Sequence, residues 1–263
     1  MIPRFFRLAR RQVDVQLRIR TFNMFSLALL ILQPAIFSIV GMILSRAAGQ
    51  SVPDLVYTVI GGGIMGMWSG LLFTSTFDIL RDRRDGLLEL IVGSPTSLGK
   101  VEGIRTFANV IAGLLSMAVA FAVAMLIFKY PLQQANLAGI LVSILFVLLG
   151  LWSMGVFLAN FLAWSRLSGA MVNFLEVPVA VVCGFMYPIS ILPEWMQSIS
   201  MVFPIRWALE AMNASLQGGI APFRLWQLWG FSLGISFLFW AVSRWMEGKV
   251  HDAIRITGEL NSI

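Results

Sequence analysis

The chain has 263 residues, of which 58% are hydrophobic and 12% are charged, about half the charged share of a typical soluble domain. Its mean hydropathy of +0.84 excludes a water-soluble protein, because so many apolar side chains cannot all be buried in one globule. The single cysteine, Cys183, excludes an internal disulfide, and a single histidine leaves no Cys/His cluster for zinc. The net charge of +6 must be interpreted by position, since the sequence predicts an integral membrane protein.

The first 23 residues predict a helix that lies along the cytoplasmic membrane surface. Arginines fill one face of this helix, and the apolar residues that recur at helical spacing on the other face are Ile2, Phe5, Phe6, Ala9, Val13 and Leu17. A helix with one basic and one apolar face binds at the membrane interface, among anionic head groups. A nucleic-acid-binding arm is the alternative, and the direct tether to a membrane span argues against it.

Six apolar stretches are long enough to cross the membrane, which takes about 20 residues of helix. They lack the alternation of a β-barrel, and only helices satisfy their own backbone groups in lipid. We therefore expect residues 24–263 to form an all-α, six-span transmembrane domain. The expected spans are about 24–45, 55–77, 106–128, 137–163, 169–187 and 225–245.

The distribution of Lys and Arg predicts the orientation. An even number of spans places both termini on one side, and fifteen Lys and Arg residues lie on that side. Four lie on the other side, namely Arg46, Lys129, Arg206 and Arg224. By the positive-inside rule, we expect cytoplasmic N- and C-termini and a multi-pass protein of the cell (plasma or inner) membrane.

Small residues recur every four positions in two neighbouring spans. In the second span these residues are Thr58, Gly62, Gly66, Gly70 and Thr74, and in the third they are Ala108, Ala112, Ser116, Ala120 and Ala124. This spacing aligns them on one helix face, which allows close packing of two spans or of two subunits. Ordinary abundance of Gly and Ala in membrane helices is the alternative. Pro34 and Pro178 are expected to kink the first and fifth spans.

The loop at 78–105 between the second and third spans contains a short amphipathic pattern. Leu87, Leu88 and Ile91 form an apolar edge beside two acids, and the pattern ends at Gly93-Ser94-Pro95. A short helix held by two spans can place its apolar edge in the groove of a partner. We therefore expect this cytoplasmic loop to be a docking element.

Two motifs resemble those of the permease subunits of type-2 ATP-binding-cassette (ABC) exporters. The first is Asp82-Arg-Arg-Asp-Gly-Leu-Leu-Glu-Leu-Ile-Val-Gly-Ser-Pro95, in which Leu87 replaces a Thr of the family pattern acidic-x-x-x-Gly-Thr-Leu-Glu-x-Leu-x-x-Ser-Pro. The second combines Gly184-Phe-Met-Tyr-Pro188 with Leu192-Pro193-Glu194-Trp195, Pro204 and Glu210. Length and expected topology agree as well, so the resemblance covers nearly the whole chain.

The resemblance implies a half-transporter without its own motor. It implies a coupling helix that docks on a separate cytoplasmic ATPase subunit through Arg83, Arg84, Asp85, Gly86, Leu87, Glu89, Leu90, Ser94 and Pro95. It also implies short helices in segment 188–224 that dip into the outer leaflet as an external gate, with Gly184, Pro188, Pro193, Trp195, Pro204 and Glu210 as gate residues. Two permeases, as a homodimer or a related pair, and two ATPase domains would form the working unit.

The chain itself is expected to be non-catalytic. The stretch 93–101 is close to a phosphate loop, but five residues separate Gly93 from Gly99 and Val101 replaces the hydroxyl that would hold magnesium. We therefore expect no cofactor on this chain, and expect ATP and magnesium on the partner ATPase. The predicted cargo is a drug, lipid, glycan or peptide.

Two rival functions remain open. An ion-coupled secondary transporter is the main one, and a single deep carboxylate without an evident internal repeat argues against it. A non-transporting membrane anchor or an intramembrane enzyme ranks below both the exporter and the secondary transporter.

Glu176 is the only carboxylate that lies deep in an expected span. Intramembrane acids are often functional, so Glu176 could line the substrate pathway together with Asn173 and Pro178. A structural hydrogen bond to Asn173, Asn160 or another helix, or a protonated carboxyl, explains it equally well. In the segment after the fifth span, Arg206 and Glu210 have the i, i+4 spacing of an ion pair.

Overall fold

The computed structural model describes residues 10–11, 14, 24–47, 52–73, 82, 85–86, 98–128, 136–164, 169–187, 189–218 and 221–257. Their regular structure is helical, and no strand occurs in these ranges, which confirms the all-α prediction. The helices are α2 (Met24–Ala47), α3 (Val52–Leu71), α6 (Leu98–Phe128), α7 (Leu137–Trp164), α8 (Gly169–Val182), the 3-10 helix η3 (Ile189–Ile191), α9 (Glu194–Ser200), α10 (Pro204–Gln217) and α11 (Pro222–Thr257). The predicted interfacial helix at 1–23 lies almost wholly outside the described residues.

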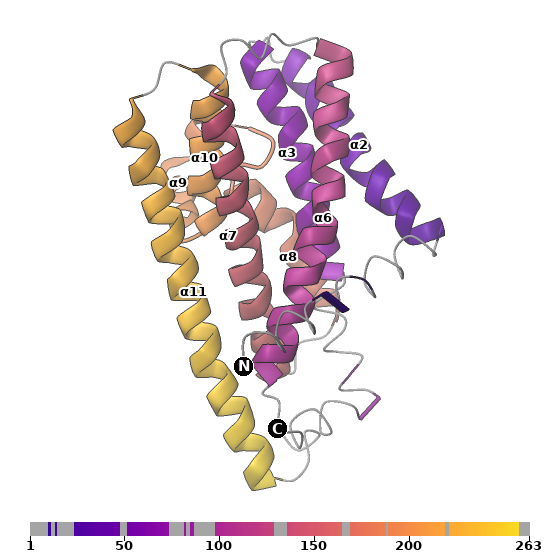
Figure 1. The fold of residues 1–263 in the computed structure, drawn as a ribbon, viewed down its shortest axis with the longest axis vertical. Helices are drawn as coiled ribbons and strands as arrows, with labels where there is room; N and C mark the ends of the chain where they lie inside the picture. Colours follow the sequence, from indigo (N-terminus) through magenta and orange to yellow (C-terminus); the bar gives the residue numbers. More distant parts are fainter. Residues whose placement is uncertain are drawn as a thin grey trace.

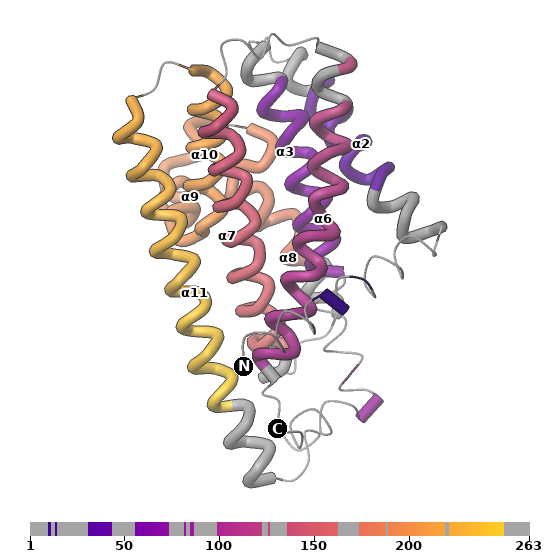
Figure 2. Tube along the Cα trace, in the orientation of Figure 1, coloured from indigo at the N-terminus to yellow at the C-terminus, as the bar shows by residue number. Residues whose placement is uncertain are grey.

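The helices form two packed groups, in which α3, α6, α7 and α11 run along the long axis of the molecule and α2 lies obliquely to it (Figure 1). In one group α3 packs against both α2 and α6, and in the other α11 and α10 pack against α7. Contacts between α6 and α7 join the two groups. Figure 2 shows the segment after α8 turning back beside one half of α7, where α9 and α10 lie.

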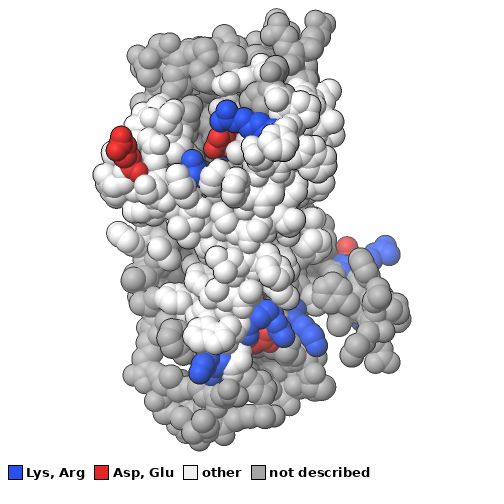
Figure 3. Space-filling view, turned by 90° about the vertical axis from the view of Figure 1, so that its left-hand side faces the viewer, with Lys and Arg blue, Asp and Glu red and all other residues white. Residues whose placement is uncertain are grey.

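Three described helices are long and apolar enough to cross a membrane. The candidate spans are Gly99–Ala122, Leu137–Leu162 and Pro222–Lys249, and two shorter apolar stretches are Ile31–Ile43 and Val56–Leu71. On the face shown in Figure 3, the Lys, Arg, Asp and Glu side chains over the helix bundle lie at two levels, above and below a broad uncharged band, and a further charged group lies off to one side. A lipid-facing belt with charged margins has this pattern. The chain is thus a multi-pass membrane protein, and the count of six spans stays a prediction.

Two helix ends differ from the expected ends of the spans. The third helix begins at Leu98, so the last residues of the predicted loop 78–105 are helical. The fifth expected span, 169–187, is helical only to Val182. It ends in a Schellman motif, in which the Gly184 amide donates to the Val181 carbonyl at 3.1 Å and the Phe185 amide to the Ala180 carbonyl at 3.1 Å. Gly184 has φ +66°, a conformation that suits glycine and stops the helix.

One turn of α3 explains why the helices of the first group pack so closely. A Cβ added to Gly61 would overlap the Phe185 carbonyl oxygen, one on Gly62 would lie 2.6 Å from the Ser38 backbone nitrogen of α2, and one on Gly63 would lie 2.6 Å from Ala120 of α6. Three consecutive glycines therefore face three different neighbours. The predicted small-residue face of α3 therefore packs against other segments of the same chain. Of these three glycines the sequence prediction had named only Gly62, because it counted every fourth residue.

Candidate functional site

The predicted coupling loop is described at Asp82, Asp85 and Gly86, and again from Leu98 onwards. Asp85 and Gly86 form an exposed turn, in which Gly86 has φ +68° and a Cβ added to it would meet no atom within 4 Å. The predicted docking residues Arg83, Arg84, Leu87, Glu89, Leu90, Ser94 and Pro95 lie outside the described residues. Their role as a coupling helix therefore stays a prediction.

The start of this loop is fixed to the first turns of α6 by an ion-pair cluster. The Arg105 guanidinium pairs with the Asp82 carboxylate and lies 3.1 Å from Oε1 of Glu102. Asp82 is 7% exposed and Glu102 is fully buried. Charged hydrogen bonds among buried groups are strong and directional. The loop residue Asp82 and the loop-proximal end of α6 therefore form one unit.

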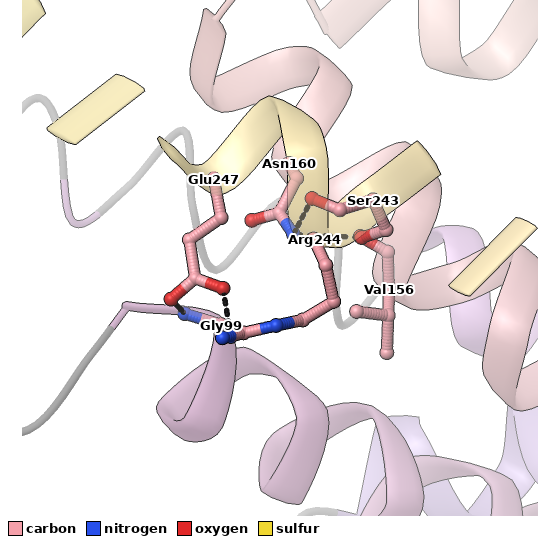
Figure 4. A network of polar contacts seen from close by, with 6 residues as sticks. All are labelled: Gly99, Val156, Asn160, Ser243, Arg244 and Glu247. Carbon is pink, nitrogen blue, oxygen red and sulfur yellow. Dashed lines mark hydrogen bonds and ion pairs between the residues drawn. The ribbon is translucent and has the colours of Figure 1, made fainter. Parts of the chain in front are cut away.

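A carboxylate of α11 caps the beginning of α6 (Figure 4). The Gly99 amide donates to Oε1 of Glu247 at 2.9 Å, and Oε2 of Glu247 pairs with Arg244. The first amides of a helix have no acceptor within the helix, and a negative charge at that end is favourable. A Cβ at position 99 would overlap the Glu247 carboxylate. Glycine at this position therefore allows α11 to bind the end of α6 where the predicted coupling loop enters.

Helix α7 is linked to both α6 and α11 at the same end of the molecule. The Asn160 amide of α7 donates to Oγ of Ser243 at 2.7 Å, and that hydroxyl donates to the Val156 carbonyl at 3.1 Å (Figure 4). Trp152 of α7 donates through Nε1 to the Gly103 carbonyl of α6 at 2.9 Å. Thus α6, α7 and α11 are linked by polar contacts around the base of the loop.

Glu247 and Arg105 were not among the sequence-predicted site residues. Glu247 follows an expected span in the sequence, and nothing in its local pattern shows that it meets residue 99. Arg105 was counted only as one of the basic loop residues. A signal did exist for Asp82, which is the first residue of the recognised motif, whereas Gly99 was considered only as part of the stretch 93–101 that is close to a phosphate loop.

Glu176 is half-buried and bonded to a neighbouring helix. Ser69 of α3 donates its hydroxyl to Oε1 of Glu176, and Trp68 donates through Nε1 to the Glu176 carbonyl at 3.1 Å. This arrangement matches the structural alternative, a hydrogen bond to another helix, with a partner that the sequence did not indicate. Pro178 is exposed, and the Asn173 side chain lies outside the described part of the chain. A pathway role for these residues stays a prediction.

The segment that follows α8 is anchored on α3. The Tyr57 hydroxyl donates to the Gly184 carbonyl at 2.7 Å, and the Thr58 hydroxyl donates to the Met186 carbonyl at 2.8 Å. Together with the close approach of Gly61 to Phe185, these bonds hold the Schellman turn against the middle of the first helix group. The predicted gate residue Gly184 therefore has a defined structural position, whereas Pro188 lies outside the described residues.

Short helices occupy the predicted gate segment. Pro193 stands immediately before α9 with ψ 148°, and Trp195 in the first turn of α9 is 64% exposed. Pro204 is the first residue of α10, where its fixed φ and missing amide suit a helix start. Glu210 carries the expected pair with Arg206 at 3.9 Å and a second pair with Arg224 at 3.5 Å. The external location of these helices rests on the predicted topology.

Comparison with known proteins finds a matching family and a relative. The family model of the ABC-2 type transporters matches residues 3–216. The linearmycin resistance permease protein LnrN of Bacillus subtilis (strain 168) is 22% identical over 175 residues, which make up 66% of this chain and 42% of that protein. The chain thus spans less than half the length of this relative. Because the family model covers most of the sequence, the chain belongs to the ABC-2 type transporter family and is an ABC transporter permease.

Proposed function

We propose that the chain is the membrane permease of an ATP-driven exporter and that it receives movement from a separate cytoplasmic ABC ATPase through the loop at residues 78–97. Family membership supports the ATPase partner and a role that is not itself catalytic. ATP and magnesium would bind the partner.

One structural observation carries the coupling proposal, namely that both ends of this loop are fixed to long helices. Asp82 is held by Arg105 of α6, and Gly99 of α6 is held by Glu247 of α11. A force applied between residues 82 and 99 therefore acts on α6 and α11 together. Because Asn160 and Ser243 link α11 to α7, the displacement would also reach α7.

The assembly we propose contains two permeases, as a homodimer or a related pair, with two ATPase domains. The relative LnrN is named for resistance to linearmycin, which supports a drug-like cargo ahead of a lipid, glycan or peptide. Export, rather than import, would fit a resistance function. These assignments extend beyond the matched part of that relative and are proposals for this chain.

The proposal is tested by co-purification of the full chain with the ABC ATPase that it binds in its host cell. Glu89→Arg reverses a charge within the predicted coupling motif and is expected to reduce the recovered ATPase at least tenfold. Glu194→Arg makes the same charge reversal on the exposed first turn of α9 and is expected to leave the recovery unchanged. Undiminished ATPase binding by Glu89→Arg, or cargo transport that runs on an ion gradient without ATP, would contradict the proposal.

A further inference from the structure

Helix α10 begins deep within the helix bundle. The Pro204 carbonyl accepts a hydrogen bond from Ser232 of α11 at 3.0 Å, and a Cβ at Gly150 of α7 would lie 3.4 Å from the Ile205 nitrogen. By helical rise, Gly150 lies about 20 Å along α7 and Ser232 about 15 Å along α11 from the first residue of each helix. The hydrocarbon core of a bilayer is about 30 Å thick. The start of α10 therefore lies inside the bundle, and the Arg206 side chain extends from there towards Glu210, which Arg224 near the beginning of α11 also contacts.

The guanidinium of Arg206 has unused hydrogen-bond donors. Its side chain is 11% exposed, and its Nε and Nη1 atoms are buried without a hydrogen-bond partner in the part of the chain that the structure describes. Nη2 is 3.9 Å from Oε2 of Glu210, which is longer than a hydrogen bond. Cζ lies 4.4 Å from the centre of the Trp207 ring, which is within the range of a cation–π contact.

The local charges are also unbalanced. Glu210 has a second partner, because Nη2 of Arg224 lies 3.5 Å from its Oε1. Two cations thus share one carboxylate, and Arg224 is 66% exposed whereas Arg206 is nearly buried. A buried charge with unsatisfied donors is unfavourable, most of all where lipid excludes water. Both the free donors and the excess positive charge favour an additional anion beside Arg206.

We propose that Arg206 is a binding site for an oxyanion, and that the oxyanion is the phosphodiester of an anionic lipid. The edge of a guanidinium matches two oxygens of a phosphate through paired hydrogen bonds. The Arg206 side chain is 11% exposed and lies against the apolar ring of Trp207, so a phosphate that is carried by acyl chains gains apolar contacts there that a free ion lacks. This site depends neither on the ATPase partner nor on the direction of transport, so its failure would leave the proposed function intact.

The test uses the full chain in micelles of dodecyl maltoside, a detergent without phosphate, with or without added phosphatidylglycerol. Phosphatidylglycerol is expected to raise the midpoint of thermal unfolding of the wild type by about 3 °C. Arg206→Gln is expected to abolish this rise. The matched control, Arg224→Gln, removes the same charge beside the same carboxylate but from an exposed side chain, and is expected to keep the rise.

Two further arms separate the alternatives. Inorganic phosphate added to the same detergent without lipid is expected to have no effect; an Arg206-dependent rise with phosphate alone would keep the oxyanion site but overturn its assignment to lipid. In detergent without lipid, Arg206→Gln is expected to unfold at the same temperature as the wild type or a higher one, because it removes an incompletely paired charge. Equal rises with phosphatidylglycerol in wild type and Arg206→Gln, or a loss of stability of Arg206→Gln in detergent without lipid, would overturn the proposal.

Discussion

The region around the predicted coupling loop and the turn after α8 are held to their neighbouring helices by different kinds of contact. Around the coupling loop the joints are charged, with Asp82 on Arg105 and Glu247 on the Gly99 amide. Around the turn after α8 the joints are neutral and steric, with the Tyr57 hydroxyl on the Gly184 carbonyl and Gly61 against Phe185. Charged contacts depend on a few atoms, whereas close backbone packing depends on the shape of a whole surface.

For the proposed coupling route, this difference predicts which region would transmit movement and which would resist it. A capped helix end can shift while its carboxylate follows, since one side chain carries the contact. Two backbones in direct contact cannot separate without losing many dispersion contacts at once. We therefore expect the Schellman turn to move with α3 as a rigid unit, and the loop-proximal ends of α6 and α11 to be the adjustable part.

The largest effect is expected from added bulk at the steric joint. Gly61→Ala places a methyl group on the Phe185 carbonyl, and backbone on both sides prevents relief, so the loss of stability should exceed about 3 kcal/mol. Gly230→Ala is the matched control, because no atom lies within 4 Å of a Cβ at that position of α11. Thermal unfolding of the purified variants measures the difference. Similar stability of the two variants would show that α3 and the turn do not pack as described.

An intermediate effect is expected at the charged joint. Gly99→Ala should destabilise the wild-type background by about 2 kcal/mol, because its methyl group displaces the Glu247 carboxylate from the α6 amide. In a Glu247→Ala background the same change should be nearly neutral, because the overlapping carboxylate is gone. The double-mutant cycle is measured by thermal unfolding. Additive effects of the two substitutions would contradict the contact between α6 and α11.

The smallest effect is expected from a single neutral hydrogen bond. Tyr57→Phe removes the bond to the Gly184 carbonyl and keeps the packing of the ring, so it should lower stability by about 1 kcal/mol. Tyr187→Phe serves as the control, because that hydroxyl donates to the Val181 carbonyl only six residues away and does not bridge to α3. Hydrogen exchange of the amides of residues 183–187 should increase in Tyr57→Phe more than in Tyr187→Phe. The reverse order would argue against anchoring of the turn on α3.

The helices themselves were predictable from the sequence, because long apolar runs have few alternatives in lipid. The charge pair of Arg206 and Glu210 was predictable for a similar reason, since i, i+4 spacing within a helix fixes proximity locally. Gly184 was recognised as part of a motif, yet its effect as a helix terminator was missed because the apolar run continues through Tyr187.

Contacts between distant segments were not predictable. Glu247 and Gly99 are 148 positions apart, and Tyr57 and Gly184 are 127 apart, so no local spacing connects them. The sequence did not show that α10 starts beside the middle of α7, because the position of a short helix within a bundle depends on tertiary packing, which composition does not encode.

The most direct test measures from which side of the membrane the predicted coupling loop can be labelled, and whether the ATPase protects it from labelling. Asp85 is exposed and the native Cys183 is fully buried, so Asp85→Cys gives a single accessible thiol for a membrane-impermeant maleimide. We predict labelling in inside-out vesicles, no labelling in intact cells, and protection when the co-purifying ABC ATPase is bound. Labelling from outside the cell, or equal labelling with and without the ATPase, would contradict the account.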